Sequence, residues 1–155
     1  MLQTINKRTT LIVSNMKRSR AFYEDCLGMT VYYDDEVIVS GDGLPAGEPG
    51  SKTHLIILKC QDPAIGMIGL VEFLEPRLPE PTKTKERVGI GDAVFVMDVD
   101  DIDEVYDRLV AHDFPLYATP HEWEIRAANG QIKRMKSVSL FEPDGCFVEL
   151  NMTLP

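Results

Sequence analysis

The chain has 155 residues, 44% of them hydrophobic, and a formal net charge of -9 at pH 7. This length fits one globular domain with a real core, and the acidic balance argues against nucleic-acid binding, which needs a basic face. The longest apolar run, residues 64–71, is too short to span a membrane, and the N-terminal residues lack the apolar stretch of a signal peptide. Three widely spaced cysteines without a CxxC pair predict reduced thiols, so we expect a cytoplasmic protein.

The first half of the chain predicts one helix and four strands. RTTLIVSN, residues 8–15, predicts a strand that ends at Asn15, a helix N-cap residue. The helix that follows is predicted over residues 17–28 and is closed by a glycine. The remaining three strands are predicted over residues 29–40, 53–60 and 67–75, with a loop rich in glycine and proline at 41–51.

The second half repeats this order of elements. Residues 91–98 predict a strand ending at a second N-cap candidate, Asp98, and the apolar spacing of residues 101–114 predicts an amphipathic helix. Further strands are predicted over residues 115–125, 134–142 and 146–152, and an Asn-Gly pair at 129–130 indicates a hairpin. We therefore predict an α+β fold in one domain, with βαβββ modules at about 8–75 and 91–152 and a polar linker at about 76–90.

Two local matches support an internal repeat. IVSNMKRSRAFY aligns with FVMDVDDIDEVY, which pairs Asn15 with Asp98. DPAIGMIGLVEF aligns with EPDGCFVEL when a small gap is allowed, and each segment ends in Val-Glu followed by an apolar residue. The second alignment makes Glu72 the counterpart of Glu149.

The predicted strands determine which way these two glutamates face. Side chains alternate along a strand, so if Val71 and Val148 pack against the helices, Glu72 and Glu149 face away from them. Two related modules would then bring both carboxylates into one concave pocket. A glutamate on the open face of an antiparallel sheet is alternatively a solubilising residue, whereas apolar neighbours on the same faces, such as Phe147, favour a partly apolar cavity.

Two segments resemble a known family. SNMKRSRAFYEDCLGM, with its polar cap, Phe-Tyr pair and Leu-Gly end, and the closing EPDGCFVEL are similar to signature segments of the vicinal oxygen chelate superfamily. That group includes glyoxalase, bleomycin resistance proteins and extradiol dioxygenases. The resemblance covers about residues 8–152. It implies two βαβββ modules in an open, U-shaped, eight-stranded mixed sheet around a small-molecule site, often in a homodimer.

The resemblance also implies candidate metal ligands. In metal-dependent members the ligands lie at the start of the first strand and at the glutamate position of the last strand of each module, which here correspond to Arg8, Glu72, Asp92 and Glu149. The family usually has histidine, or sometimes glutamine, at both strand starts, so this chain departs at two positions. Arginine cannot ligate a metal. The three carboxylates form an all-oxygen set that suits hard ions, so the cofactor is either none or a divalent metal (Mg, Mn or Fe).

Three carboxylates that converge in a partly apolar pocket need compensation, because they repel one another and lose their hydration. A divalent metal would supply it. Arg8 would supply it by bridging Glu72 or Glu149, and protonation of one carboxylate is a third solution.

Four further residues are candidates for ligand binding. His54 and His121 can donate to a ligand or act as a general base, and a local hydrogen bond within the sheet is their simpler role. Tyr117 and Trp123 can line a ligand pocket, and core or dimer packing explains them equally well.

Three functions remain open at this stage. A metal-free protein that binds a small organic molecule is favoured, because the strand-start histidines are missing. The alternative is a divalent-metal-dependent lyase, isomerase or ring-cleavage dioxygenase acting on a small oxygenated or aromatic metabolite, in which Glu149 is ligand or base and Glu72 its partner. A metal-free lyase or isomerase with one of these glutamates as base is the third.

Overall fold

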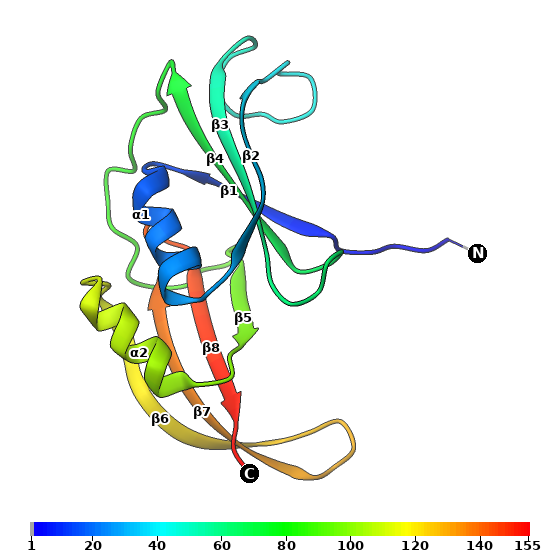
Figure 1. Cartoon of the computed structure of the whole chain (residues 1–155), viewed down its shortest axis with the longest axis vertical. Helices are drawn as coiled ribbons and strands as arrows, with labels where there is room; N and C mark the ends of the chain where they lie inside the picture. Colours follow the sequence, from blue (N-terminus) through cyan, green and yellow to red (C-terminus); the bar gives the residue numbers. More distant parts are fainter. Residues whose placement is uncertain (1) are drawn as a thin grey trace. The chain divides into compact units, whose positions relative to one another are not determined.

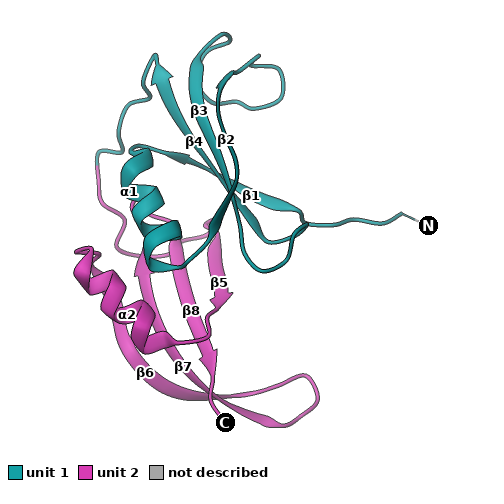
Figure 2. Ribbon diagram, in the orientation of Figure 1, with its two compact units in different colours: residues 1–82 teal, residues 83–155 magenta. Residues whose placement is uncertain are grey.

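A computed structural model describes residues 2–155 (Figure 1). The chain divides into two compact units, unit 1 up to Thr82 and unit 2 from Lys83 to Pro155 (Figure 2), and this boundary falls inside the predicted linker. Each unit contains a helical segment and a four-stranded mixed sheet, which confirms the prediction of an α+β fold built from two βαβββ modules. Among the described residues, no helix combines the length and the apolar character needed to cross a lipid bilayer.

Unit 1 begins with a strand and a helix whose start the sequence predicted correctly. The Asn15 side chain accepts the backbone N–H of Arg18 at 3.1 Å and caps α1, Met16–Arg20, which continues as the π-helix η1, Ala21–Cys26. The strands are β1, Arg8–Val13; β2, Thr30–Ile38; β3, Lys52–Lys59; and β4, Met67–Glu75. Their order in the sheet is β1-β4-β3-β2, with β1 parallel to β4 and the other neighbours antiparallel.

Unit 2 has the same topology. Its elements are β5, Val94–Asp98; α2, Ile102–Ala111; β6, Leu116–Arg126; β7, Ile132–Phe141; and β8, Phe147–Thr153, in the sheet order β5-β8-β7-β6. The N-cap of α2 is Asp101, whose carboxylate accepts two backbone N–H groups of the first helical turn at 3.0 Å. The prediction of Asp98 as the cap was wrong, because Asp98 still pairs with Asn151 at the end of β5.

The two observed caps correct the predicted repeat. With Asn15 matched to Asp101, Thr10 on β1 corresponds to Val96 on β5, 86 residues later. Thr10 is in register with Gly69, and Val96 is in register with Glu149. Glu149 therefore corresponds to Gly69. Glu72 lies farther along β4, in register with Val13, so the predicted equivalence of Glu72 and Glu149 was wrong.

In unit 1 the face of the sheet that packs against the helix also carries Glu72. Leu70, Ile56 and Leu58 are fully buried on this face, and Glu72 shares it with Leu70 by strand alternation. The Glu72 carboxylate accepts the backbone N–H of Met16, at the start of α1, at 3.3 Å. The prediction that Glu72 faces away from the helix was therefore wrong.

Unit 2 confirms the corresponding prediction for Glu149. Val148 and Leu150 are fully buried. They share their face with Lys136 of β7, which is in register with Met152. The Lys136 ammonium group forms an ion pair with Asp103 of α2 at 2.6 Å. This face is the one that packs against α2. Glu149 alternates with these residues and so faces the opposite side of the sheet, which we call the open face of unit 2.

Candidate functional site

Glu149 lies in the middle of β8, half-buried, with Val96 of β5 and Ser139 of β7 as its neighbours in register. Asn151 donates its side-chain N–H to Glu149 Oε1 at 3.0 Å. Within unit 2 as described, no lysine, arginine or histidine nitrogen lies within ion-pair distance of Glu149. Its second oxygen has no hydrogen-bond partner in the same region of the chain. The open face thus presents a carboxylate with one engaged oxygen and one available oxygen.

A chain of hydrogen bonds orients this carboxylate. Trp123 Nε1 donates to Ser137 Oγ at 2.7 Å, and the Ser137 hydroxyl donates to Asn151 Oδ1. The indole N–H is only a donor, so the hydroxyl proton of Ser137 remains free for Asn151. With its oxygen engaged there, Asn151 must direct its NH₂ group towards Glu149. Ser137 and Asn151 are 2% and 4% exposed, so the chain is shielded from water and holds Glu149 as an acceptor.

An aromatic cluster lies beside the carboxylate. The Phe147 ring, two residues from Glu149 on β8, meets Phe141 and Tyr117 edge to face, with ring centroids 5.0 Å and 5.6 Å apart. Tyr117 is 68% exposed and Val96 is 66% exposed. Exposed aromatic and aliphatic surface around one oriented polar group is typical of a ligand-binding surface.

The remaining predicted residues of unit 2 have local partners. His121 is in register with Ser137, but its Nδ1 lies 2.9 Å from the backbone oxygen of Thr119 and its side chain is exposed. Asp92 lies in the turn before β5. A hydrogen bond from Lys85, whose Nζ is 2.5 Å away, and a second from the backbone of Gly89 hold the pKa of Asp92 below its usual value.

The donor set at the positions that the resemblance identified does not fit a metal. Because β5 starts at Val94, the residue that corresponds to Arg8 is Val94 and not Asp92. With Gly69 in the place that corresponds to Glu149, the four positions hold Arg8, Gly69, Val94 and Glu149. Only Glu149 can ligate a metal ion. Within neither unit of residues 2–155 is there a group of three or more His, Cys, Asp or Glu side chains placed to hold one.

Arg8 does not bridge Glu72. Arg8 is in register with Met67, at the far end of β4 from Glu72. The Arg8 side chain lies over Gly69: if Gly69 were replaced by a residue with a Cβ, that atom would be 3.3 Å from Arg8 Cδ. This side of Gly69 is the face of the sheet opposite to the one that carries Glu72. The predicted bridge from Arg8 to Glu72 was wrong. The bridge to Glu149, which lies in the other unit, stays a prediction.

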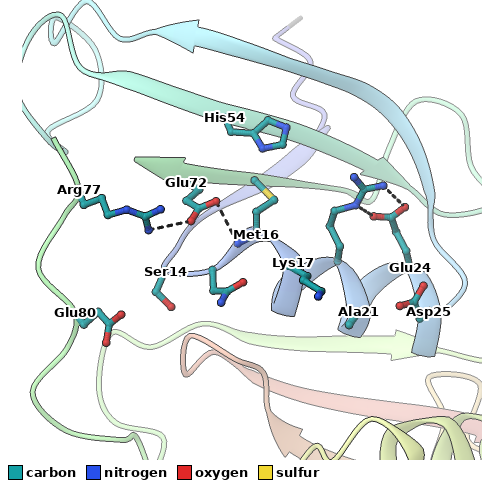
Figure 3. Close-up of a pocket in the computed structure, with 12 residues that line it drawn as sticks. Ser14, Met16, Lys17, Ala21, Glu24, Asp25, His54, Glu72, Arg77 and Glu80 are labelled. Atoms are coloured by element: carbon teal, nitrogen blue, oxygen red, sulfur yellow. Dashed lines mark hydrogen bonds and ion pairs between the residues drawn. The ribbon is translucent and has the colours of Figure 1, made fainter. Parts of the chain in front are cut away.

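Unit 1 has a cleft of about 750 Å³ on its helix side, and it brings two predicted residues together (Figure 3). Glu72 of β4 and His54 of β3 are partners in register. Arg77 approaches Glu72 Oε1 at 3.4 Å, and His54 Nε2 lies 2.6 Å from Asp34 Oδ1 on β2. We call this the α1 cleft. Sequence reasoning missed Asp34 and Arg77, because only strand pairing and chain reversal bring them to His54 and Glu72.

The comparisons with known proteins agree with the fold. Residues 6–150 match the model of the Glyoxalase/Bleomycin resistance protein/Dioxygenase superfamily. The chain belongs to this superfamily. No curated protein sequence matches it significantly.

Several solved structures share its architecture. A glyoxalase family protein from Bacillus cereus has a TM-score of 0.74 at 19% identity, over 100% of this chain and 96% of that one. Glyoxalase I of Leishmania major has a TM-score of 0.58 at 20% identity, over 96% and 86% of the two chains. The virulence protein STM3117 of Salmonella typhimurium has a TM-score of 0.51 at 20% identity, over 99% and 100%. At these identities the likeness shows the fold alone.

Proposed function

We propose that this superfamily member binds a small organic molecule, without a metal, on the open face of unit 2. The observation that carries the proposal is the single oriented carboxylate of Glu149 beside the cluster of Tyr117, Phe141 and Phe147. The available oxygen of Glu149 positions a ligand, and the aromatic rings supply apolar contact area.

The chemistry of the open face defines the class of ligand. The available oxygen of Glu149 is an acceptor, so the ligand presents an N–H or O–H donor to it. Tyr117 is largely exposed and lies edge to face with Phe147, which favours a flat ring that buries this apolar surface. The ligand class is therefore a small aromatic molecule with a hydrogen-bond donor.

The donor set weighs against the metal-dependent alternative. A chelate enzyme polarises its substrate through a metal held by several donors, whereas Arg8, Gly69 and Val94 at the corresponding positions supply none. Glu149 then binds the ligand directly. If the protein turns its ligand over, Glu149 is also the group placed to accept a proton from it.

A fluorescence titration tests the proposal. Trp123 is the single tryptophan of the chain and belongs to the hydrogen-bond chain that ends at Glu149, so occupancy of the open face changes its emission. A panel of phenols, anilines and their O-methyl and N,N-dimethyl analogues, which lack the donor, is titrated against the native protein and against Glu149→Gln. Glu122→Gln is the matched control, because Glu122 is an exposed carboxylate of β6 paired with Arg134.

We expect saturable emission changes with the donor-bearing compounds, about tenfold weaker binding in Glu149→Gln, and native affinity in Glu122→Gln. Equal binding of the methylated analogues would contradict the role of Glu149. Stoichiometric metal in purified protein that disappears in Glu149→Gln would overturn the metal-free proposal.

We also propose that the protein is a cytoplasmic homodimer. Each four-stranded sheet ends in two edge strands whose outer backbone groups are unpaired within that sheet, and such edges favour association. Three widely spaced cysteines without a CxxC pair suit a reducing compartment. Light scattering on the purified chain tests the dimer, and a monomer mass at micromolar concentration would contradict it.

A further inference from the structure

The α1 cleft belongs to unit 1 and has no part in the open face described above. Its floor is formed by His54 and Glu72, and its wall by residues of α1 and η1 such as Met16 and Ala21 (Figure 3). Its volume of about 750 Å³ is typical of small-molecule sites.

Hydrogen bonding determines which nitrogen of His54 carries the proton. The Asp34 carboxylate lies 2.6 Å from Nε2, and an ionised carboxylate is only an acceptor. Nε2 therefore bears a proton, and in the neutral form of the ring Nδ1 is an acceptor. Among residues 2–155, Nδ1 has no hydrogen-bond partner. The His54 side chain is 27% exposed, so this acceptor remains accessible to a ligand.

Glu72 is the second acceptor of the cleft, and its charge is only partly compensated. Its side chain is 12% exposed. Its two contacts, 3.3 Å from the Met16 N–H and 3.4 Å from Arg77, are at the long end of the range for hydrogen bonds. Arg77 is 68% exposed, and an ion pair with so exposed a partner contributes little. A bound donor can therefore replace Arg77 at small cost.

Two further cationic side chains line the cleft, and both come from α1. Lys17 is exposed, and Arg20 is already engaged. Arg20 pairs with Glu24 and approaches Asp34 at 3.6 Å. These contacts satisfy its guanidinium and help to hold Asp34 against His54. They leave Nδ1 of His54 and the carboxylate of Glu72 as the two acceptors at the floor of the cleft.

Two acceptors on neighbouring strands, in register, are complementary to a ligand with two donors. Residues directly opposite each other on a sheet have Cβ atoms about 5 Å apart, which an amidinium or guanidinium group spans with two N–H groups. We propose that the α1 cleft binds a small organic cation with at least two N–H donors, of the amidine or guanidine class. One N–H group bonds Nδ1 of His54 and the other bonds Glu72.

Benzamidine is the test probe, with benzamide as its neutral isostere and benzoate as an anion of the same size. Binding is followed by the backbone amide signals of Met16 and His54 in a ¹H–¹⁵N correlation spectrum. Glu72→Gln removes the charge and keeps an oxygen for the Met16 N–H. Glu122→Gln is again the control carboxylate. His54→Asn is a second variant, so a failure of Glu72→Gln to fold leaves the proposal testable.

We expect benzamidine to shift both signals saturably, Glu72→Gln to weaken its binding by about tenfold, and Glu122→Gln to bind as the native protein does. Benzamide and benzoate should leave the signals in place. Equal binding of benzamide, native affinity in both Glu72→Gln and His54→Asn, or shifts confined to unit 2 would overturn the proposal. Trp123 emission and Glu149→Gln report only on unit 2, so failure here is distinguishable from failure of the proposed function.

Discussion

Glu142, in the turn between β7 and β8, links the stability of unit 2 to pH. Its side chain is buried, with 3% of the residue exposed. One carboxylate oxygen accepts the backbone N–H groups of Cys146 and Asp144 at 2.9 Å and 3.0 Å. The other oxygen is buried with no hydrogen-bond partner among the described residues. Burial raises the pKa of Glu142 from 4.5 to about 7, because the two N–H groups only partly offset the lost hydration.

The sign of the effect follows from this raised pKa. The folded protein keeps the Glu142 proton up to about pH 7, whereas the unfolded chain releases it near 4.5, so the unfolded state binds fewer protons between these values. The free energy of unfolding therefore falls as pH rises through this window and is constant, for this group, outside it. A difference of about 2.5 pKa units corresponds to about 3 kcal/mol.

Glu142→Gln removes this dependence. The amide oxygen can still accept both backbone N–H groups, and the amide does not titrate. Urea unfolding between pH 4 and pH 8 should therefore show the variant gaining about 3 kcal/mol relative to the native protein as pH rises. The measured quantity is the change with pH in the difference between the two free energies of unfolding. Any pH-independent effect of the new NH₂ group cancels from this change. Glu122→Gln, at an exposed site, should show no such gain. A difference between Glu142→Gln and native protein that stays flat across this range would refute the reasoning.

Two further predictions concern a helix cap and the hydrogen-bond chain. Asp101→Ala should lower the free energy of unfolding by about 1 kcal/mol, because two N–H groups of α2 lose their acceptor. Asp98→Ala should change this free energy by less than about 0.5 kcal/mol. Equal effects of the two substitutions in urea unfolding would contradict the assigned cap. Ser137→Ala leaves Trp123 Nε1 without its acceptor and should cost about 1–3 kcal/mol. Ser139→Ala, at a buried serine two residues along β7, is its control and should cost less.

The sequence was sufficient to predict the elements and their order, because these depend on local patterns. The short apolar run at residues 67–75 and the spacing of apolar residues in 101–114 are properties of neighbouring positions. The cap at Asn15 was identified correctly, since only Ser14 and Asn15 stand between the strand and the helix. In the second module Asp98, Asp100 and Asp101 all stand there. Only the strand pairing of Asp98 with Asn151 identifies Asp101 as the cap.

The error in the candidate site has the same size as the error at the cap. Pairing Asn15 with Asp98 instead of Asp101 misplaces β1 by three residues relative to β5. Pairing Glu72 with Glu149 misplaces β4 by three residues relative to β8, because Gly69 is the residue that corresponds to Glu149. An odd shift on a strand exchanges its two faces. That is why Glu72 lies on the helix side of its sheet while Glu149 lies on the open face, although both follow a valine in similar sequences. The Val-Glu motif is local, but the parallel register that sets its face comes from a strand more than 50 residues away. The observed start of β5 moves the second strand-start position from Asp92 to Val94 and leaves Glu149 as the single carboxylate of the set. The two glutamates therefore do not occupy equivalent positions, and we assign them to two separate proposed sites, the α1 cleft and the open face of unit 2.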